Sequence, residues 1–183
     1  SAGMNWKHFH SWPLFGDGAA AVIIEHDGPS RLKGYLHQTF SEGRDLCRVV
    51  AGGIKRNIRS VPQPGEDEYL FSMLGHKVYK LAAKKLPLFL ERLLEQNKVS
   101  IDDIDLFIPH QASGMALAHF RKRLSIDRSR MVETYPRLGN QIAASIPSAL
   151  HEAIVNQRVL RGSRVMLIGS AAGLSLAGLV LEV

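Results

Sequence analysis

Residues 105–124 read "DLFIPHQASGMALAHFRKRL", and the apolar run at the start of this stretch ends in Pro109 and His110. Leu106–Pro109 is short and apolar, as expected of a strand buried on both faces. A helical pattern follows over residues 112–124, and its inward residues are Ala116, Leu117, Phe120 and Leu124. Because α/β folds place ligand sites at the carboxyl ends of strands, His110 is a candidate functional residue. A hydrogen-bonded core histidine is the alternative.

Outward from this stretch, strands and helices alternate. The pattern predicts a strand over residues 14–25, "LFGDGAAAVIIE", and an antiparallel neighbour over residues 31–40. Residues 43–68 contain "AGG" and "VPQPGED" and are expected to form an irregular excursion on the surface. A helix is expected over residues 69–98, with Leu74, Val78 and Leu81 as its apolar stripe and a kink or break at Pro87.

The remaining elements complete an α/β pattern. "SRMVETY" is a candidate for a further strand, and Asn140 is predicted to cap a helix over residues 141–157. The uncharged segment 165–181 is at the short limit for crossing about 30 Å of hydrocarbon. Its glycines favour two buried strands around a turn, so we expect no membrane span.

Composition narrows the class of protein. The chain has 183 residues, a formal charge of +6 and a pI near 9.7, which favours acidic partners such as nucleic acid, phosphorylated cofactors or an acidic carrier protein. A single cysteine excludes an internal disulfide and suits a reducing compartment. No basic-then-apolar signal sequence opens the chain, so we expect a cytoplasmic location.

Three motifs are set aside. "GDGAAA" at residues 16–21 resembles a dinucleotide-binding pattern, but its glycines precede a strand, so close backbone packing is the preferred interpretation. His8 and His10 lack further ligands at metal-binding spacing, and we expect no metal. Cys47 has no strand-to-helix elbow around it and is interpreted as a small buried residue.

His110 and Asn140 form a candidate pair. Both precede predicted helices, and an imidazole and a carboxamide are neutral donors near neutral pH. Together they could hold an oxygen on which negative charge develops. The spacing alone is equally compatible with His110 as a hydrogen-bonded core histidine and with Asn140 as a plain helix cap.

Basic residues follow the helix after His110, at Arg121, Lys122, Arg123, Arg128 and Arg130. No stacking aromatics lie between them, which disfavours a site for single-stranded nucleic acid. A solvated helix face and a docking patch for an acidic partner are both open.

Five ordered blocks give the sequence a family resemblance. "LFGDGAAAVI", "YLFSMLGHKVY", "IDLFIPHQAS", "GNQIAASIPSALHEAI" and "GSRVMLIGSAAGLSLAGLVL" resemble β-ketoacyl-acyl-carrier-protein synthase III, of the thiolase-like condensing superfamily. The resemblance covers residues 14–183 as one C-terminal domain. Residues 1–13 are expected to form a separate N-terminal segment. Residues 1–3 are either native or left over from cloning.

The resemblance implies the C-terminal half of a thiolase-like fold, a mixed β-sheet flanked by helices. The family's nucleophilic cysteine lies in the N-terminal half, and Cys47 falls outside its setting. The fragment alone is therefore expected to be inactive. The complete enzyme is expected to be a homodimer.

By the same resemblance, His110 and Asn140 match the catalytic histidine and asparagine that hold the enolate oxygen during decarboxylation. Ala171 matches the backbone donor of a second oxyanion hole. Arg121, Lys122 and Arg123 match the region that meets acyl carrier protein. The implied substrates are acyl-CoA and malonyl-carrier protein, with no cofactor.

Departures from the family's pattern leave the substrate open. Ser113 stands where an asparagine is usual, Ser170 and Ala171 replace an aromatic residue and a glycine, and Leu176 takes the place of a bulky aromatic. The rival hypotheses are an acyltransferase or condensing enzyme of secondary metabolism, a non-catalytic subunit of a condensing complex, and a basic nucleic-acid-binding module.

Overall fold

A four-stranded mixed sheet organises the chain, in the strand order β1-β6-β5-β4. The computed structural model describes residues 3–9 and 11–183. β4 pairs in parallel with β5, whereas β5 with β6 and β6 with β1 are antiparallel. The strands are β1 (Arg31–Thr39), β4 (Leu106–Pro109), β5 (Arg164–Ala171) and β6 (Ser175–Glu182). The predicted fold class, a mixed sheet flanked by helices, is confirmed.

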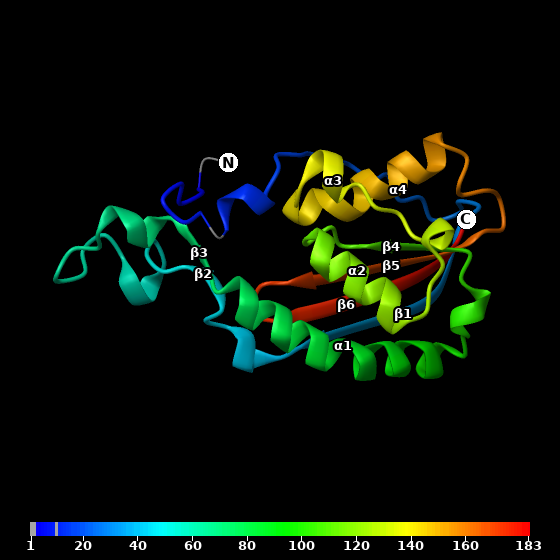
Figure 1. Cartoon of the computed structure of the whole chain (residues 1–183), viewed down its shortest axis with the longest axis horizontal. Helices are drawn as coiled ribbons and strands as arrows, with labels where there is room; N and C mark the ends of the chain where they lie inside the picture. The colour runs from blue at the N-terminus through cyan, green and yellow to red at the C-terminus, as the bar shows by residue number, and fades with distance from the viewer. Residues whose placement is uncertain (1–2, 10) are drawn as a thin grey trace.

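Helices cover the two faces of this sheet. Figure 1 shows α1 below the strands and α4 above them. Because successive side chains of a strand point to opposite faces, β4 contributes to two cores. Phe107 packs in the core that α1 and α2 close, and Leu106 and Ile108 pack against α4. The helices are α1 (Gly75–Asn97), α2 (Gly114–Arg123), the short α3 (Tyr135–Leu138) and α4 (Ser145–Val155).

The predicted surface excursion contains a second, two-stranded sheet. β2 (Cys47–Val49) pairs with β3 (Phe71–Met73), and Met4 adds an isolated bridge to Phe71. Figure 1 shows this pair at one end of the molecule, beyond the main sheet. Short 3-10 turns occur at Trp12–Leu14, Ser41–Gly43, Ile54–Arg56, Glu66–Tyr69, Ile101–Asp103, Arg128–Arg130 and Ile142–Ala144.

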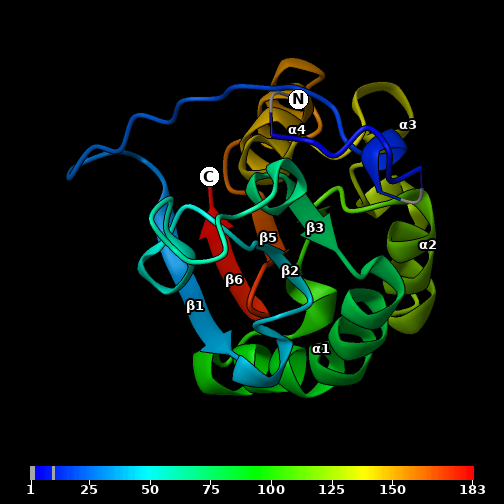
Figure 2. The same cartoon turned by 90° about the vertical axis from the view of Figure 1, so that its left-hand side faces the viewer.

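The prediction of a strand over residues 14–25 is wrong. Within the described residues this segment belongs to no sheet, and Val22, Ile23 and Ile24 are 64%, 89% and 91% exposed. Figure 2 shows it passing α4 on the way to β1. β1 itself is confirmed, but its partner is β6, because the C-terminal strand occupies the position expected for residues 14–25.

The long helix differs from its prediction in two ways. α1 is continuous through Pro87, and it buries Phe89, Leu90 and Leu93 instead of a stripe that includes the half-exposed Leu74. The buried residues lie in the second half of α1, where the helix crosses the sheet. There the side chain of Leu93 approaches Gly178 so closely that a Cβ at Gly178 would lie 2.5 Å from it.

Two further elements are shorter than predicted. In "SRMVETY" the predicted strand is reduced to an isolated bridge between Met131 and Phe107. The helix expected over residues 141–157 begins at Ser145, after a 3-10 turn at residues 142–144. Ile142 has a φ of 54°, which interrupts a regular helix at this point.

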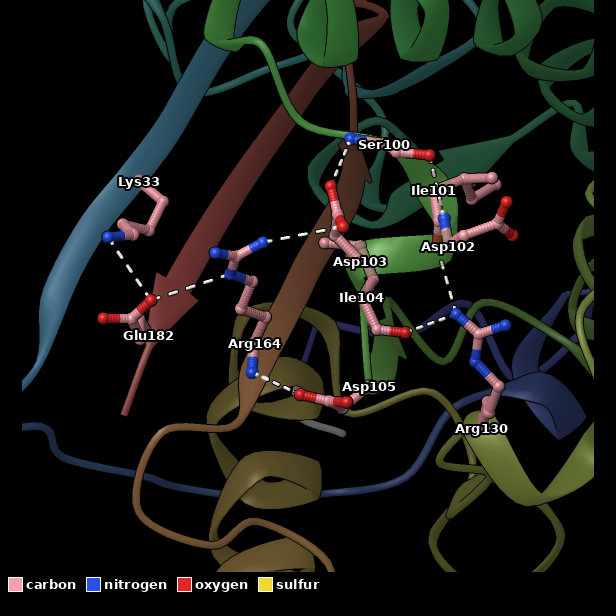
Figure 3. Close-up of polar contacts among 10 residues, drawn as sticks. All are labelled: Lys33, Ser100, Ile101, Asp102, Asp103, Ile104, Asp105, Arg130, Arg164 and Glu182. Atoms are coloured by element: carbon pink, nitrogen blue, oxygen red, sulfur yellow. Dashed lines mark hydrogen bonds and ion pairs between the residues drawn. The ribbon is translucent and has the colours of Figure 1, made fainter.

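A polar network ties the strands together at the end of the sheet where β4 begins. Figure 3 shows Arg164 between Asp103 and Glu182, at 3.7 and 3.6 Å, with Lys33 3.3 Å from Glu182. The backbone N–H of Arg164 also donates to Asp105 over 2.7 Å. This network therefore joins three strands and the turn before β4.

Candidate active site

His110 directly follows β4, as predicted. Its backbone N–H donates to the carbonyl of Ile168 over 2.7 Å, which extends the β4–β5 ladder by one residue. Its Nδ1 lies 2.6 Å from the hydroxyl of Ser145, at the start of α4. The ring is thus fixed between the end of a parallel strand and the helix on the other face of the sheet.

The ring of His110 borders an apolar cleft of about 90 Å³. α1 and α2 supply one side of this cleft, and the ends of β4, β5 and β6 supply the other. Tyr79 and His119 meet edge to face across the two helices, with their ring centroids 5.7 Å apart. The apolar helical residues of the lining are Ala82, Ala83, Leu86, Ala116, Leu117 and Phe120.

Burial governs the protonation of His110. Desolvation lowers the pKa of the ring to about 4 from its ordinary 6.5, because the imidazolium cation is less stable away from water. The ring is therefore neutral near pH 7. A neutral imidazole carries one donor nitrogen and one acceptor nitrogen.

Asn140 is held beside the same strand end. It is 8% exposed, its Oδ1 accepts the N–H of Ile142 over 2.9 Å, and its Nδ2 lies 3.4 Å from the carbonyl of Ala112. Ala112 is two residues beyond His110. The turn that begins at Asn140 therefore contacts the His110 segment twice, through Asn140 at Ala112 and through Ser145 at the imidazole.

The glycines of "GDGAAA" position Asn140. The Gly16 N–H donates to the Asn140 carbonyl over 3.0 Å, and a Cβ at Gly16 would lie 2.0 Å from the carbonyl oxygen of Leu138. No other residue fits this approach without separating the two segments. The close backbone packing predicted for this stretch is confirmed at Gly16.

The other predicted site residues, at the end of β5 and at the end of α2, do not line the cleft. Ala171 is the exposed last residue of β5, and its neighbour Ser170 lines the cleft. Arg121, Lys122 and Arg123 form the last turn of α2, where cations also interact favourably with the helix dipole.

Arg130 does not belong to a docking patch. Its guanidinium donates to the carbonyls of Ile101 and Ile104 and lies over the ring of Phe107. These contacts satisfy backbone oxygens beside β4. The guanidinium of Arg130 is therefore engaged in contacts that stabilise the fold.

Ser145 is the site residue that the sequence interpretation missed. It is completely buried and touches the ring of His110. Its signal was weak, because a serine among small residues near a helix start is ordinary capping chemistry. Only the three-dimensional structure shows that its hydroxyl reaches a histidine 35 residues away.

His8, His10 and Cys47 are the remaining side chains with metal-binding or nucleophilic chemistry considered above. His8 is exposed, and His10 lies outside the described residues. Burial raises the pKa of the Cys47 thiol, which opposes the reactive thiolate. Across residues 3–9 and 11–183, no three His, Cys, Asp or Glu side chains gather as metal ligands, and no helix has the length and apolarity to span a bilayer.

Comparison with known proteins shows which proteins the chain is similar to. The family described as 3-oxoacyl-[acyl-carrier-protein (ACP)] synthase III C terminal matches residues 94–183. Beta-ketoacyl-[acyl-carrier-protein] synthase III of Porphyra umbilicalis is 34% identical over 98% of the chain and 55% of its own length. The chain is similar in sequence to the C-terminal part of β-ketoacyl-[acyl-carrier-protein] synthase III.

Further relatives agree on the part of these synthases that the chain resembles. The synthase III of Pasteurella multocida is 37% identical over 88% of the chain and 49% of that relative. The crystal structure of 3-oxoacyl-[acyl-carrier-protein] synthase III from Aquifex aeolicus VF5 covers the whole chain and 55% of its own, with a TM-score of 0.83 and 25% identity. The chain spans about half the length of these synthase III proteins and corresponds to their C-terminal half.

Proposed function

We propose that this chain is the C-terminal catalytic part of an enzyme that condenses acyl-CoA with malonyl-carrier protein in fatty acid biosynthesis. One observation carries the proposal: a neutral, partly buried His110 borders an apolar cleft, and the Asn140 amide lies against the carbonyl of Ala112, two residues beyond His110. The curated relatives named above are both called beta-ketoacyl-[acyl-carrier-protein] synthase III.

In the proposed reaction, the thioester carbonyl oxygen of the malonyl group accepts hydrogen bonds from His110 and Asn140. The bond to the carboxylate breaks, carbon dioxide leaves, and the electron pair moves onto the carbonyl oxygen as an enolate. The enolate carbon then attacks an acyl thioester on a cysteine, which is expected outside this chain, and the thiolate leaves. Donors aimed at the oxygen favour the charged intermediate over the neutral substrate.

Several features of the chain support these roles. The cleft is lined mainly by aliphatic and alanine side chains, which suits the uncharged thioester end of a carrier arm. Because burial lowers the pKa of His110 to about 4, the ring is neutral near pH 7 and would donate to the oxygen as an uncharged imidazole. Ala171 is proposed to supply a backbone N–H to the acyl-cysteine carbonyl.

The test separates condensation from acyl transfer in the full-length protein that contains this chain. His110→Ala and Asn140→Ala should each lower decarboxylative condensation at least about 100-fold, because each removes one donor to the enolate oxygen. Transfer of the acyl group from acyl-CoA to the cysteine should persist. His151→Ala is a control, since His151 borders a different cavity beside α4.

Condensation at the normal rate in His110→Ala would remove the histidine from the mechanism. Products formed with small alcohols or amines in place of malonyl-carrier protein would favour the acyltransferase alternative. The present chain alone should catalyse neither reaction, because the nucleophile is expected in the other half of the complete enzyme. That complete enzyme is proposed to be a homodimer.

Carrier docking is proposed for the basic end of α2. Lys122→Glu with Arg123→Glu should raise the KM for an acidic carrier protein and leave kcat unchanged, because rim charges act on encounter and binding. Lys55→Glu makes the same kind of charge change on the exposed excursion and should have no effect. An unchanged KM in the double variant would exclude this surface.

A further inference from the structure

Ser145 gives His110 its only side-chain hydrogen bond within the described residues. The Oγ of Ser145 lies 2.6 Å from Nδ1 and 2.9 Å from the carbonyl oxygen of Ile142. Both Ser145 and its hydroxyl are shielded from water, because the residue is completely buried. The hydroxyl has one hydrogen, so two arrangements fit these contacts: Oγ donates to the Ile142 carbonyl and accepts Nδ1–H, or Oγ turns and donates to Nδ1.

Two observations indicate that the hydroxyl donates to the imidazole. The separation of 2.6 Å between Oγ and Nδ1 is shorter than the roughly 2.7–3.2 Å of an N–H donor to oxygen, which disfavours donation from Nδ1–H to Oγ. The carbonyl of Ile142 already accepts the backbone N–H of Ser145. That carbonyl therefore keeps a donor when the hydroxyl turns to Nδ1.

We propose that Ser145 is a positioning residue that fixes His110 in the tautomer with its proton on Nε2. If Nδ1 accepts a hydrogen bond, the single proton of the neutral ring must sit on the other nitrogen. Nε2 has no partner among the described residues, so it is available to an oxygen in the cleft. The catalytic meaning of this arrangement rests on the proposed function, which needs a donor and not an acceptor at this nitrogen.

The turn that carries Ser145 is strained, as expected of a segment that holds a site in place. Ile142 adopts a φ of 54°, which is rare and energetically unfavourable for a β-branched residue. The Asn140 side chain holds this conformation by accepting the Ile142 N–H. The strained residue thus lies between the two side chains that contact the His110 segment.

The tautomer can be measured in the 183-residue chain without any substrate. Two-bond proton–nitrogen spectra of the histidine-labelled chain near pH 7 should show His110 with its proton on Nε2, assigned by comparison with His110→Gln. In Ser145→Ala the signals should move toward a mixture of tautomers, because the donor to Nδ1 is gone. Ser145→Cys, of similar volume but with a weak donor, should resemble Ser145→Ala.

The measured pKa of His110 gives a second, signed readout. A hydroxyl that donates to Nδ1 stabilises the neutral ring, so Ser145→Ala should raise the pKa of His110. If Nδ1–H instead donates to Oγ, the same substitution should lower that pKa. Ser148→Ala removes a hydroxyl from the same helix on the side of another cavity and should change neither readout.

A proton on Nδ1 in the unsubstituted chain would overturn the proposal, as would an unchanged spectrum in Ser145→Ala. In the full-length enzyme, Ser145→Ala should lower the kcat of condensation about 10-fold and leave acyl transfer to the cysteine intact. If the unsubstituted enzyme does not condense, the proposed function fails, but the tautomer measured in the chain still stands.

Discussion

Acidification should destabilise this chain through His110. Burial lowers the pKa of the folded-state ring to about 4, whereas the unfolded chain exposes a ring with the ordinary pKa of 6.5. Below pH 6.5 the imidazole therefore binds a proton in the unfolded state, whereas in the folded state it stays neutral until the pH approaches 4. Stability is full above the unfolded-state pKa and falls as the pH drops toward the folded-state pKa.

The size of the effect follows from the two pKa values. Each pKa unit of difference between the two states corresponds to about 1.4 kcal/mol. At pH 5, which lies between the pKa of 6.5 and the pKa of about 4, only part of the full difference is lost. Between pH 7 and pH 5, His110 alone should lower the free energy of unfolding by about 2 kcal/mol. That is a large share of the roughly 5–15 kcal/mol that stabilises a typical domain.

Urea denaturation followed by far-ultraviolet circular dichroism at the two pH values measures this loss. His110→Gln removes the titrating ring and keeps a polar group beside Ser145. The remaining histidines and carboxylates titrate in both proteins, so subtracting the two pH dependences isolates the ring. The unsubstituted chain should lose about 2 kcal/mol more than the variant.

Equal losses in both proteins would refute the reasoning. That result would mean that His110 is solvated or paired with an anion in solution, because only a desolvated neutral ring resists protonation. A larger loss in the variant would contradict the sign of the argument.

Three further predictions concern the frame around the site. Leu93→Ala should lower the free energy of unfolding by about 3 kcal/mol, because Leu93 is fully buried, whereas Leu88→Ala on the exposed side of α1 should cost little. Gly16→Ala should cost about 2 kcal/mol by forcing its backbone away from Leu138, with Gly53→Ala, which has open space, as its control. Arg164→Met should lower the free energy of unfolding by at most about 1 kcal/mol, and by less in high salt, because its ion pairs are partly exposed. Denaturant midpoints measure all three changes. A larger loss in Arg164→Met than in Leu93→Ala would contradict this ranking.

Local patterns were sufficient where an element carries its own signal. The apolar run that ends at His110, the helix after it and the two C-terminal strands are short-range features, and the structure has them nearly as predicted. The same reasoning was wrong for residues 14–25. Its β-branched residues favour a strand, but a strand also needs a neighbour, and β6 pairs with β1 instead.

The sequence by itself determined the fold class, the position of His110 at a strand end and the likeness to the synthase III family, because hydrophobic period, glycine placement and ordered motifs are all properties of neighbouring residues. The tertiary structure decided how the site is held. The contacts of Ser145 with His110 and of Gly16 with Leu138 join residues far apart in the chain. Such contacts depend on how the elements pack, and no local pattern encodes them.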